Sequence, residues 1–203
     1  TNLSAYHAYV ADGRYTESGV ANAVSPVFHE LAGRTWGVFG YGNIGKKVAR
    51  VADAIGCRVL VCKRTKTQED YPVVDLDTLC RESDILTVHS PLTEQTRGIF
   101  DRAHLALMKK DAILVNVARG AVCDEEAIAD AILENRLGGV GIDVYSKEPF
   151  GNDHAMARIA GRDNVILTPH MAWGSYEARV RCCEEIALNI ESFIAGERRN
   201  RIV

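Results

Sequence analysis

The stretch Val38-Phe39-Gly40-Tyr41-Gly42-Asn43-Ile44-Gly45 decides the fold of this chain. An apolar run precedes it and apolar residues at helical spacing follow it, so it joins a strand to a helix. In such a turn Gly40 permits the tight bend, Gly42 leaves room for a pyrophosphate, and Gly45 lets the helix pack closely on the strand. The helix N-terminus offers N–H groups and a positive dipole end to phosphates. This context predicts dinucleotide binding rather than a glycine turn without a ligand.

The composition is that of a globular domain. Hydrophobic residues make up 47% of the 203 residues, which is enough for a sizeable core. The net charge of −3 predicts neither a nucleic-acid partner nor an anionic membrane partner. No apolar run is long enough for a membrane helix, and no signal peptide opens the chain. The six cysteines are scattered without a C-x-x-C, so we expect free thiols and a cytoplasmic location.

Strands and helices alternate between residues 33 and 174. This alternation predicts an α/β fold, a doubly wound parallel sheet of Rossmann type with helices on both faces, in three layers. The strands are almost wholly apolar, as expected when both faces are covered. We expect strands at 35–39, 58–62, 85–89, 112–116, 138–142 and 165–168. We expect helices near 44–55, 75–82, 101–107 and 124–134.

The two ends of the chain do not follow this alternation. Residues 1–32 begin with the tail of a helix, which Asp12-Gly13-Arg14 interrupts, and continue as a loop-like arm. Residues 175–203 contain a helix from Ser175 to Gly196 with apolar residues on one face. The chain is therefore expected to consist of an arm (1–32), a nucleotide-binding domain (33–174) and a C-terminal helix (175–203).

The second predicted strand ends at Lys63-Arg64-Thr65. An NAD site carries an acidic residue near this position to hold the ribose hydroxyls. Two cations and a hydroxyl instead favour a 2′-phosphate, and hence NADP(H), although NAD(H) and a solvated basic turn remain alternatives. Glu69 and Asp70 are acidic, but they lie too far beyond the end of this strand to replace the missing acid.

Three side chains with complementary chemistry follow later strand ends. They are Arg119, Glu148 and His170. A guanidinium suits a substrate carboxylate, an imidazole can give a proton to a carbonyl oxygen, and a carboxylate can hold that imidazole and stabilise its charged form. Because the carboxyl ends of parallel strands meet at one edge, these groups indicate reduction of a 2-oxo acid. No metal site is expected. His89, at another strand end, is interpreted as structural.

At these motifs the chain resembles the D-isomer-specific 2-hydroxyacid dehydrogenases, and its 169–179 stretch is similar to their glycerate dehydrogenase/hydroxypyruvate reductase branch. The resemblance implies a catalytic triad of Arg119, Glu148 and His170, with Asp143 at the nicotinamide carboxamide. The cofactor-binding residues expected from the turn, the basic segment and the resemblance are Gly40, Gly42, Asn43, Ile44, Gly45, Lys63, Arg64, Thr65, Ser90, Pro91, Thr96, Val117, Ala118, Arg119, Asp143 and His170.

The resemblance also sets expectations for the whole protein. It implies an oxidoreductase acting on a short 2-oxo or 2-hydroxy acid such as hydroxypyruvate or glyoxylate. Family members form homodimers through an arm like residues 1–32, and their last helix returns to a substrate domain, most of which this chain lacks. The chain alone is therefore expected to have little activity. The alternative is a dinucleotide-sensing interaction module, like the corepressors related to this family.

Overall fold

The fold is built on one parallel sheet. The computed structural model describes residues 3–65 and 69–201, and there six strands pair in the order β2-β1-β3-β4-β5-β6. The chain runs outward from β1 to β2 and then returns to the other side of β1, so the winding direction switches between β1 and β3. The doubly wound parallel sheet is confirmed. The strands are β1 (Thr35–Phe39), β2 (Arg58–Cys62), β3 (Ile85–Val88), β4 (Ile113–Asn116), β5 (Gly139–Ile142) and β6 (Val165–Leu167), each within one residue of its predicted bounds.

The strand register brings the carboxyl ends of all six strands to one edge of the sheet. Each strand's last residue pairs with the last residue of its neighbour. The turns that follow the strands therefore share this edge. The paired ends are Phe39 with Cys62, Phe39 with Val88, Val88 with Asn116, Asn116 with Ile142, and Ile142 with Leu167.

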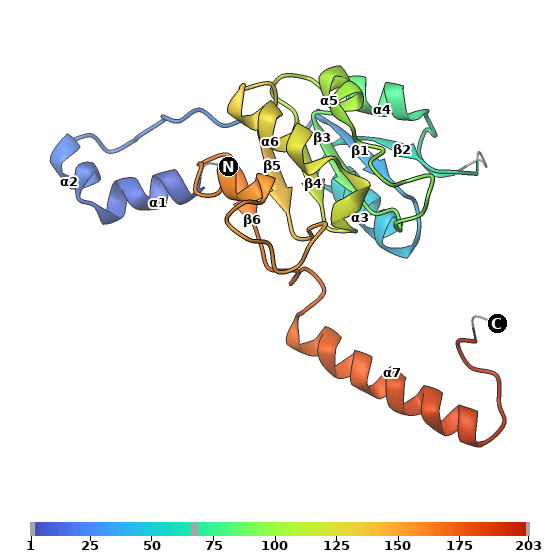
Figure 1. The fold of residues 1–203 in the computed structure, drawn as a ribbon. Coiled ribbons are helices and arrows are strands. Elements are labelled where there is room, and N and C mark those ends of the chain that lie inside the picture. The colour runs from blue at the N-terminus through green and yellow to red at the C-terminus, as the bar shows by residue number, and fades with distance from the viewer. Residues whose placement is uncertain (1–2, 66–68, 202–203) are drawn as a thin grey trace.

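Three of the helices between the strands begin at aspartate side chains that cap them. Asp75, Asp101 and Asp124 each accept a hydrogen bond from the backbone N–H three residues later, at 2.7–3.0 Å. Helices α4, α5 and α6 follow these caps and cover one face of the sheet, while α3 covers the other face (Figure 1). The helices are α3 (Asn43–Ala54), α4 (Leu76–Glu82), α5 (Arg102–Leu107) and α6 (Glu125–Leu133), with short 3₁₀ turns at Gly120–Val122 and Ala155–Arg158.

Helix α3 packs on the sheet through its small residues. Gly45, Ala49 and Ala52 are buried, whereas Ile44 and Val51 are 63% and 60% exposed. Small side chains allow the helix to approach β1 and β2 closely, so the larger apolar residues of the predicted helical pattern face outward. The periodicity predicted the helix but not which of its faces meets the sheet.

The face of the sheet that α3 covers is only partly covered. Leu114 on β4 is buried under the helices of the opposite face, but its neighbours along the strand point the other way. Ile113 is 41% exposed and Ile166 is 67% exposed. Among the described residues, the second helical layer therefore extends over β1 and β2 and not over β4 to β6.

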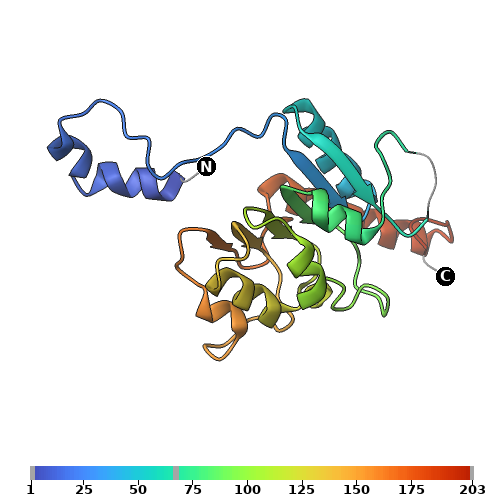
Figure 2. The same cartoon turned by 90° about the horizontal axis from the view of Figure 1, so that it is seen from above.

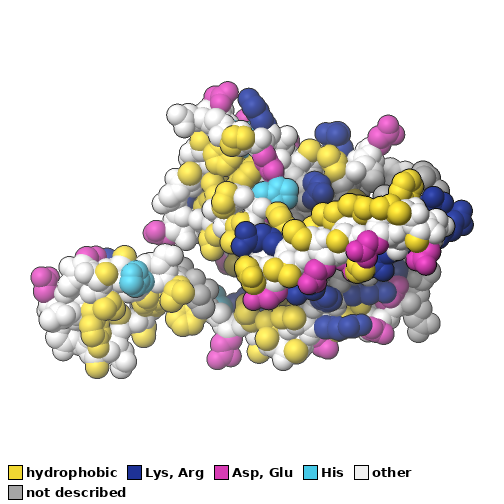
Figure 3. Space-filling view, turned by 90° about the horizontal axis from the view of Figure 1, so that it is seen from below, with side chains coloured by type: hydrophobic (Ala, Val, Ile, Leu, Met, Phe, Trp, Pro, Cys, Tyr) yellow, Lys and Arg dark blue, Asp and Glu magenta, His cyan; other side chains and the backbone are white. Residues whose placement is uncertain are grey.

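Both ends of the chain extend away from the sheet (Figures 1 and 2). The arm forms α1 (Leu3–Ala11) and, where only a loop was predicted, a short α2 (Arg14–Ser18). Gly13 and Gly19 flank α2 with positive φ, which isolates it as a separate turn of helix. Helix α7 (Tyr176–Ile194) begins at a Ser175 cap and has no buried residue. Its apolar side chains form a band along the molecule (Figure 3). No helix in the described ranges could span a bilayer.

The carboxylate of Asp84 ties the opposite edge of the sheet together. It accepts hydrogen bonds from Thr35 N at 2.8 Å and from Lys109 Nζ at 2.9 Å. Burial alone would raise the Asp84 pKa, but these two bonds outweigh it and the pKa is lowered. A lowered pKa in the folded state contributes stability above the unfolded-state pKa, and this contribution is lost as the pH falls through the folded value.

Asp84→Asn is therefore expected to lower the free energy of unfolding by about 1–2 kcal/mol at pH 7. The difference from the unsubstituted chain should begin to shrink as the pH falls below 4, where the unfolded state becomes protonated, and should be smallest below the lowered folded-state pKa, where the carboxyl group is protonated in both states. Urea titrations at several pH values measure this. The exposed Asp163 provides the control, since Asp163→Asn should have little effect. A loss of stability independent of pH would contradict the assigned role of the Asp84 charge.

Candidate active site

The turn between β1 and α3 contains glycines with different roles. A Cβ on Gly40 (φ +92°) would lie 2.6 Å from Ser90 N, and one on Gly45 would lie 2.0 Å from the carbonyl oxygen of Gly40. Both glycines are required by the close packing of the chain itself. A Cβ on Gly42 would meet nothing within 4 Å, and its φ of −86° suits any residue. The fold therefore does not require glycine at 42, and the open space there is available to a ligand.

A groove of about 550 Å³ lies along the carboxyl edge beside this turn. It joins the turn to the segments that follow β2 and β3, so residues far apart in the sequence form one wall. Lys63 is largely covered, whereas Arg64 and Thr65 are exposed. The predicted cofactor-binding residues that line this groove are Gly40, Gly42, Lys63, Arg64, Thr65, Ser90, Pro91 and Thr96. Asn43, Ile44 and Gly45 lie at the adjoining N-terminus of α3, where no side chain caps the helix.

The segment after β3 holds its own shape. Thr96 Oγ1 donates to Pro91 O at 2.7 Å and accepts from Thr93 N at 2.8 Å, so its hydroxyl closes the loop. Burial lowers the pKa of His89 to about 4, and neither of its ring nitrogens has a hydrogen-bond partner among the described residues. His89 is therefore uncharged at neutral pH.

The loop after β4 presents Arg119. The buried Asn116 accepts from Ala118 N and donates to Arg119 O, both at 3.0 Å, which fixes the turn. A Cβ on Gly120 would lie 2.0 Å from the backbone carbon of Tyr145, so glycine is required where this loop meets the loop after β5. The Arg119 side chain is exposed, and its Nη1 donates to Ala118 O at 2.7 Å. Val117 and Ala118 are half-buried in the same turn.

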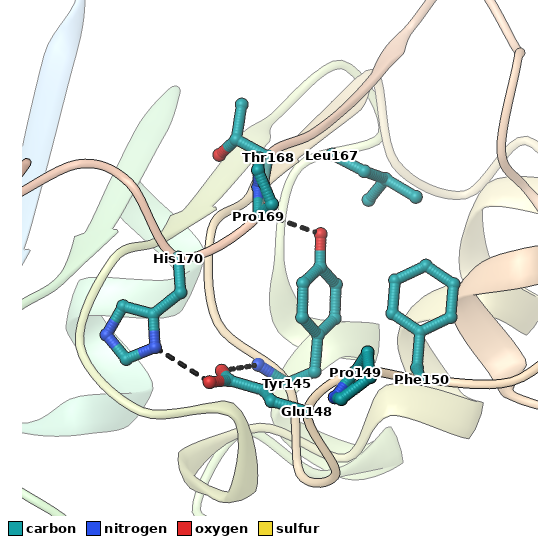
Figure 4. A pocket seen from close by; sticks show the side chains of 8 residues that line it. All are labelled: Tyr145, Glu148, Pro149, Phe150, Leu167, Thr168, Pro169 and His170. Carbon is teal, nitrogen blue, oxygen red and sulfur yellow. Dashed lines mark hydrogen bonds and ion pairs between the residues drawn. The ribbon is translucent and has the colours of Figure 1, made fainter.

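Glu148 and His170 form a close pair. Their Oε2 and Nδ1 atoms are 2.7 Å apart, and Glu148 Oε1 accepts from Tyr145 N at 2.8 Å (Figure 4). The hydrogen bond with His170, followed by that from Tyr145, lowers the Glu148 pKa. Glu148 is therefore an ionised acceptor, Nδ1 is the donor, and Nε2 of His170 is left for another partner. A cavity of about 410 Å³, walled by Tyr145, Phe150 and Leu167 of β6, adjoins the pair.

Asp143, at the end of β5, holds the segment that carries His170. Its Oδ1 accepts from Thr168 Oγ1 at 2.5 Å and from Met171 N at 2.9 Å, and its Oδ2 accepts from Ala172 N at 2.9 Å. Burial would raise the pKa of this carboxyl, but these bonds outweigh burial and the pKa is lowered. The carboxylate thus sets the path of residues 168–172, in which His170 has a φ of +52°. The contact of Asp143 with a nicotinamide, which the resemblance implies, stays a prediction.

A further polar cluster supports the loop that carries Glu148. Glu125, the first residue of α6, accepts hydrogen bonds from Ser146 N at 2.9 Å and from Ser146 Oγ. Its Oε2 also lies 3.1 Å from His154 Nε2, while His154 Nδ1 accepts from Met156 N. Both ring nitrogens of His154 are therefore used in holding loops together. We did not predict this cluster, because its three residues look like ordinary surface residues when the sequence is read alone.

The residues of this edge suit a dinucleotide. The open space at Gly42, the uncapped N-terminus of α3 and the adjoining groove provide room, N–H donors and positive charge for a phosphate-containing ligand. The structure brings Glu148 and His170 into contact, and it places Arg119 on a neighbouring loop without a hydrogen bond to either. In the described ranges, no group of three or more His, Cys, Asp or Glu side chains could hold a metal ion.

Residues 1–172 match the family model described as "D-isomer specific 2-hydroxyacid dehydrogenase, NAD binding domain". The chain belongs to this family. It is 38% identical to the glycerate dehydrogenase of Methylorubrum extorquens over 85% of this chain and 54% of that protein. It is 41% identical to the hydroxypyruvate reductase of Thermotoga maritima over 79% of this chain and 53% of that protein.

Solved structures of this dehydrogenase fold superpose closely on the chain. The acyclic imino acid reductase Bsp5, in complex with NADPH and D-Arg, is 33% identical and superposes with a TM-score of 0.83 over 96% of this chain and 62% of that one. The chain spans about half the length of the curated relatives it matches. The family membership confirms the predicted resemblance and identifies the chain as a domain of the NAD-binding type.

The two glycines of the turn give a matched pair of substitutions. Gly42→Ala should leave the free energy of unfolding nearly unchanged but weaken NADH and NADPH binding at least roughly tenfold, because the new methyl group fills the open space. Gly45→Ala should instead lower the free energy of unfolding by about 1–3 kcal/mol through overpacking. Thermal unfolding and fluorescence titration measure the two effects. Unchanged binding of both dinucleotides by Gly42→Ala would show that they do not bind at this turn.

Proposed function

We propose that this chain is the dinucleotide-binding part of an oxidoreductase that interconverts a short 2-oxo acid and its D-2-hydroxy acid, with hydroxypyruvate or glyoxylate as substrate. The observation that carries this proposal is the Glu148–His170 pair, at the same edge as the glycine turn. The names of the relatives, glycerate dehydrogenase and hydroxypyruvate reductase, support this substrate class. They give no support to the alternative of a dinucleotide-sensing interaction module.

Each polar side chain of the site would have its own role in the reaction. When bound, the dinucleotide supplies or accepts the hydride. His170 Nε2 gives a proton to the carbonyl oxygen during reduction, since Nδ1 is engaged by Glu148. The ionised Glu148 orients the ring and stabilises its protonated form. Arg119 binds the substrate carboxylate through its guanidinium, whose planar fork matches a carboxylate.

We also propose that the groove prefers NADP(H) to NAD(H). Lys63, Arg64 and Thr65 line it at the end of β2, where an NAD site would carry an acid. Among the solved relatives, the imino acid reductase Bsp5 holds NADPH and two D-lactate dehydrogenases hold NAD, so the proposal rests on the residues of this chain. The remaining cofactor-binding residues keep the roles predicted for them, with Asp143 near the nicotinamide. A cytoplasmic location fits the free cysteines of the chain.

The preference can be measured on the chain itself by titrating NADPH and NADH and following nicotinamide fluorescence. A charge-assisted contact to the 2′-phosphate contributes about 1.5–3 kcal/mol, so NADPH should bind roughly one to two decades more tightly. Raising the salt concentration should reduce the difference, because exposed charges are screened. Equal or tighter binding of NADH would contradict the assignment.

The catalytic roles require a protein that carries this chain together with a substrate domain. In it, His170→Ala should lower the rate of hydroxypyruvate reduction by roughly two to four decades. Glu148→Gln should lower the rate roughly tenfold or more, because the amide no longer offers the carboxylate that orients the ring and accepts from Nδ1. Steady-state rates of the unsubstituted protein and the two variants measure both losses. An undiminished rate in Glu148→Gln would show that Glu148 does not have this role.

We further propose that residues 1–32 mediate a homodimer. The arm extends from the sheet, and its apolar side chains are exposed, as are Ile113 of β4 and Ile166 of β6 on the open face. Light scattering should give at least a dimeric mass for the chain, and deletion of residues 1–32 should reduce it to a monomer. A monomeric mass for the intact chain at micromolar concentration would contradict the proposal.

The chain alone should turn over substrate slowly. Substrate orientation supplies roughly 7–11 kcal/mol of barrier lowering in enzymes, and a substrate domain is needed for this orientation.

A further inference from the structure

A carboxylate lies beside the cation expected to bind the 2′-phosphate. Lys63 Nζ forms an ion pair with Glu69 Oε1, and Lys46 Nζ lies 4.0 Å from Glu69 Oε2. The side chains of Lys63 and Glu69 are 14% and 19% exposed, so water screens this pair less than it screens a surface pair. Part of the positive charge at the end of β2 is therefore balanced by the protein itself.

The segment that carries Glu69 is fixed against β2 and α3. Val61 donates to Pro72 O at 3.0 Å and accepts from Val74 N at 2.9 Å, so the chain after Glu69 runs parallel to β2. The ring of Tyr71 packs edge-on against that of Tyr41 in the glycine turn, with centroids 6.4 Å apart. These contacts anchor the segment at the turn that would hold the pyrophosphate.

Tyr71 and Lys46 tie the same segment to α3. Tyr71 OH donates to Asp53 Oδ2 at 3.3 Å, and Lys46 Nζ lies 5.5 Å from the centre of the Tyr41 ring. The residues that follow Glu69 are therefore held in place by several contacts, and the Glu69 carboxylate lies beside Lys63 and Lys46. A carboxylate in such a position competes with any second anion for the same cations.

We propose that Glu69 is a specificity-determining residue that limits the preference of the groove for a 2′-phosphorylated dinucleotide. The inference rests on the proposed function, namely that this groove binds NAD(P)(H). A 2′-phosphate carries close to two negative charges at pH 7 and must take Lys63 from Glu69 before it gains a charge-assisted bond. The unphosphorylated dinucleotide brings no such charge and leaves the Lys63–Glu69 pair in place.

The test compares the ratio of the NADPH and NADH dissociation constants in the chain and in two neutralised variants. Glu69→Gln should shift the ratio roughly tenfold toward NADPH, the factor that one charge-assisted hydrogen bond contributes. Asp70→Asn is the matched control, because it removes the same charge one residue further along. It should change the ratio by less than about twofold.

A double-substitution cycle shows whether Glu69 acts through Lys63. In a Lys63→Gln chain, the further change Glu69→Gln should shift the ratio much less, because only Lys46, whose Nζ is 4.0 Å from Glu69 Oε2, then remains as a cation for which the carboxylate competes. A shift of the same size in the Lys63→Gln background would overturn the assigned mechanism. If Glu69→Gln does not fold, as judged by thermal unfolding, Glu69→Asp retains the charge but shortens its reach and should shift the ratio in the same direction.

The outcomes separate this inference from the proposed function. Binding of both dinucleotides with an unchanged ratio in Glu69→Gln would overturn the role of Glu69 and leave the proposed function intact. An equal loss of affinity for NADH and NADPH in Glu69→Gln would show that Glu69 has a structural role only, and this result would also overturn its role in specificity. Failure of the unsubstituted chain to bind either dinucleotide would refute the proposed function, and with it this inference.

Discussion

The turn between β1 and α3 can close only because Gly45 has no side chain. A Cβ there would lie 2.0 Å from the carbonyl oxygen of Gly40. This close approach sets the N-terminus of α3 directly beyond the end of β1. It also places Gly40 against the backbone of His89 and Ser90, which follow β3. The two strands on either side of the switch point are thereby joined at the edge where phosphate-binding groups are needed.

The other half of the site depends on a second set of close contacts. Gly120 lets the Arg119 loop meet the backbone of Tyr145, whose N–H holds Glu148. The Asp143 carboxylate accepts hydrogen bonds from the Thr168 hydroxyl before His170 and from the N–H groups of Met171 and Ala172 after it. The side chains of Glu148 and His170 are half-exposed. Asp143 and Tyr145, which position them, are buried. The sheet edge is thus rigid where it orients side chains and open where a substrate would enter.

The sequence was sufficient for the sheet and for the edge at which the site lies. Buried parallel strands are continuous apolar runs, and their ends are marked by polar residues such as Asn116 and Asp143. Three features depended on contacts that periodicity does not encode, two of them set by loop paths and one by helix packing. Glu69 reaches Lys63 because residues 71–74 run beside β2. Glu125 reaches Ser146 across two loops. The outward direction of Ile44 follows from the close approach that the small residues of α3 allow.

The central claim is that the N–H groups at the start of α3 hold the phosphates of a dinucleotide. The most direct measurement is an amide NMR spectrum of the ¹⁵N-labelled chain during titration with NADPH. The account predicts that the amide resonances of Asn43, Ile44 and Gly45 move, together with those of the segments that line the groove. Resonances of α1, which lies in the arm well away from α3 in Figures 1 and 2, should stay in place. Binding that leaves the amides of residues 43–45 unchanged would contradict the account.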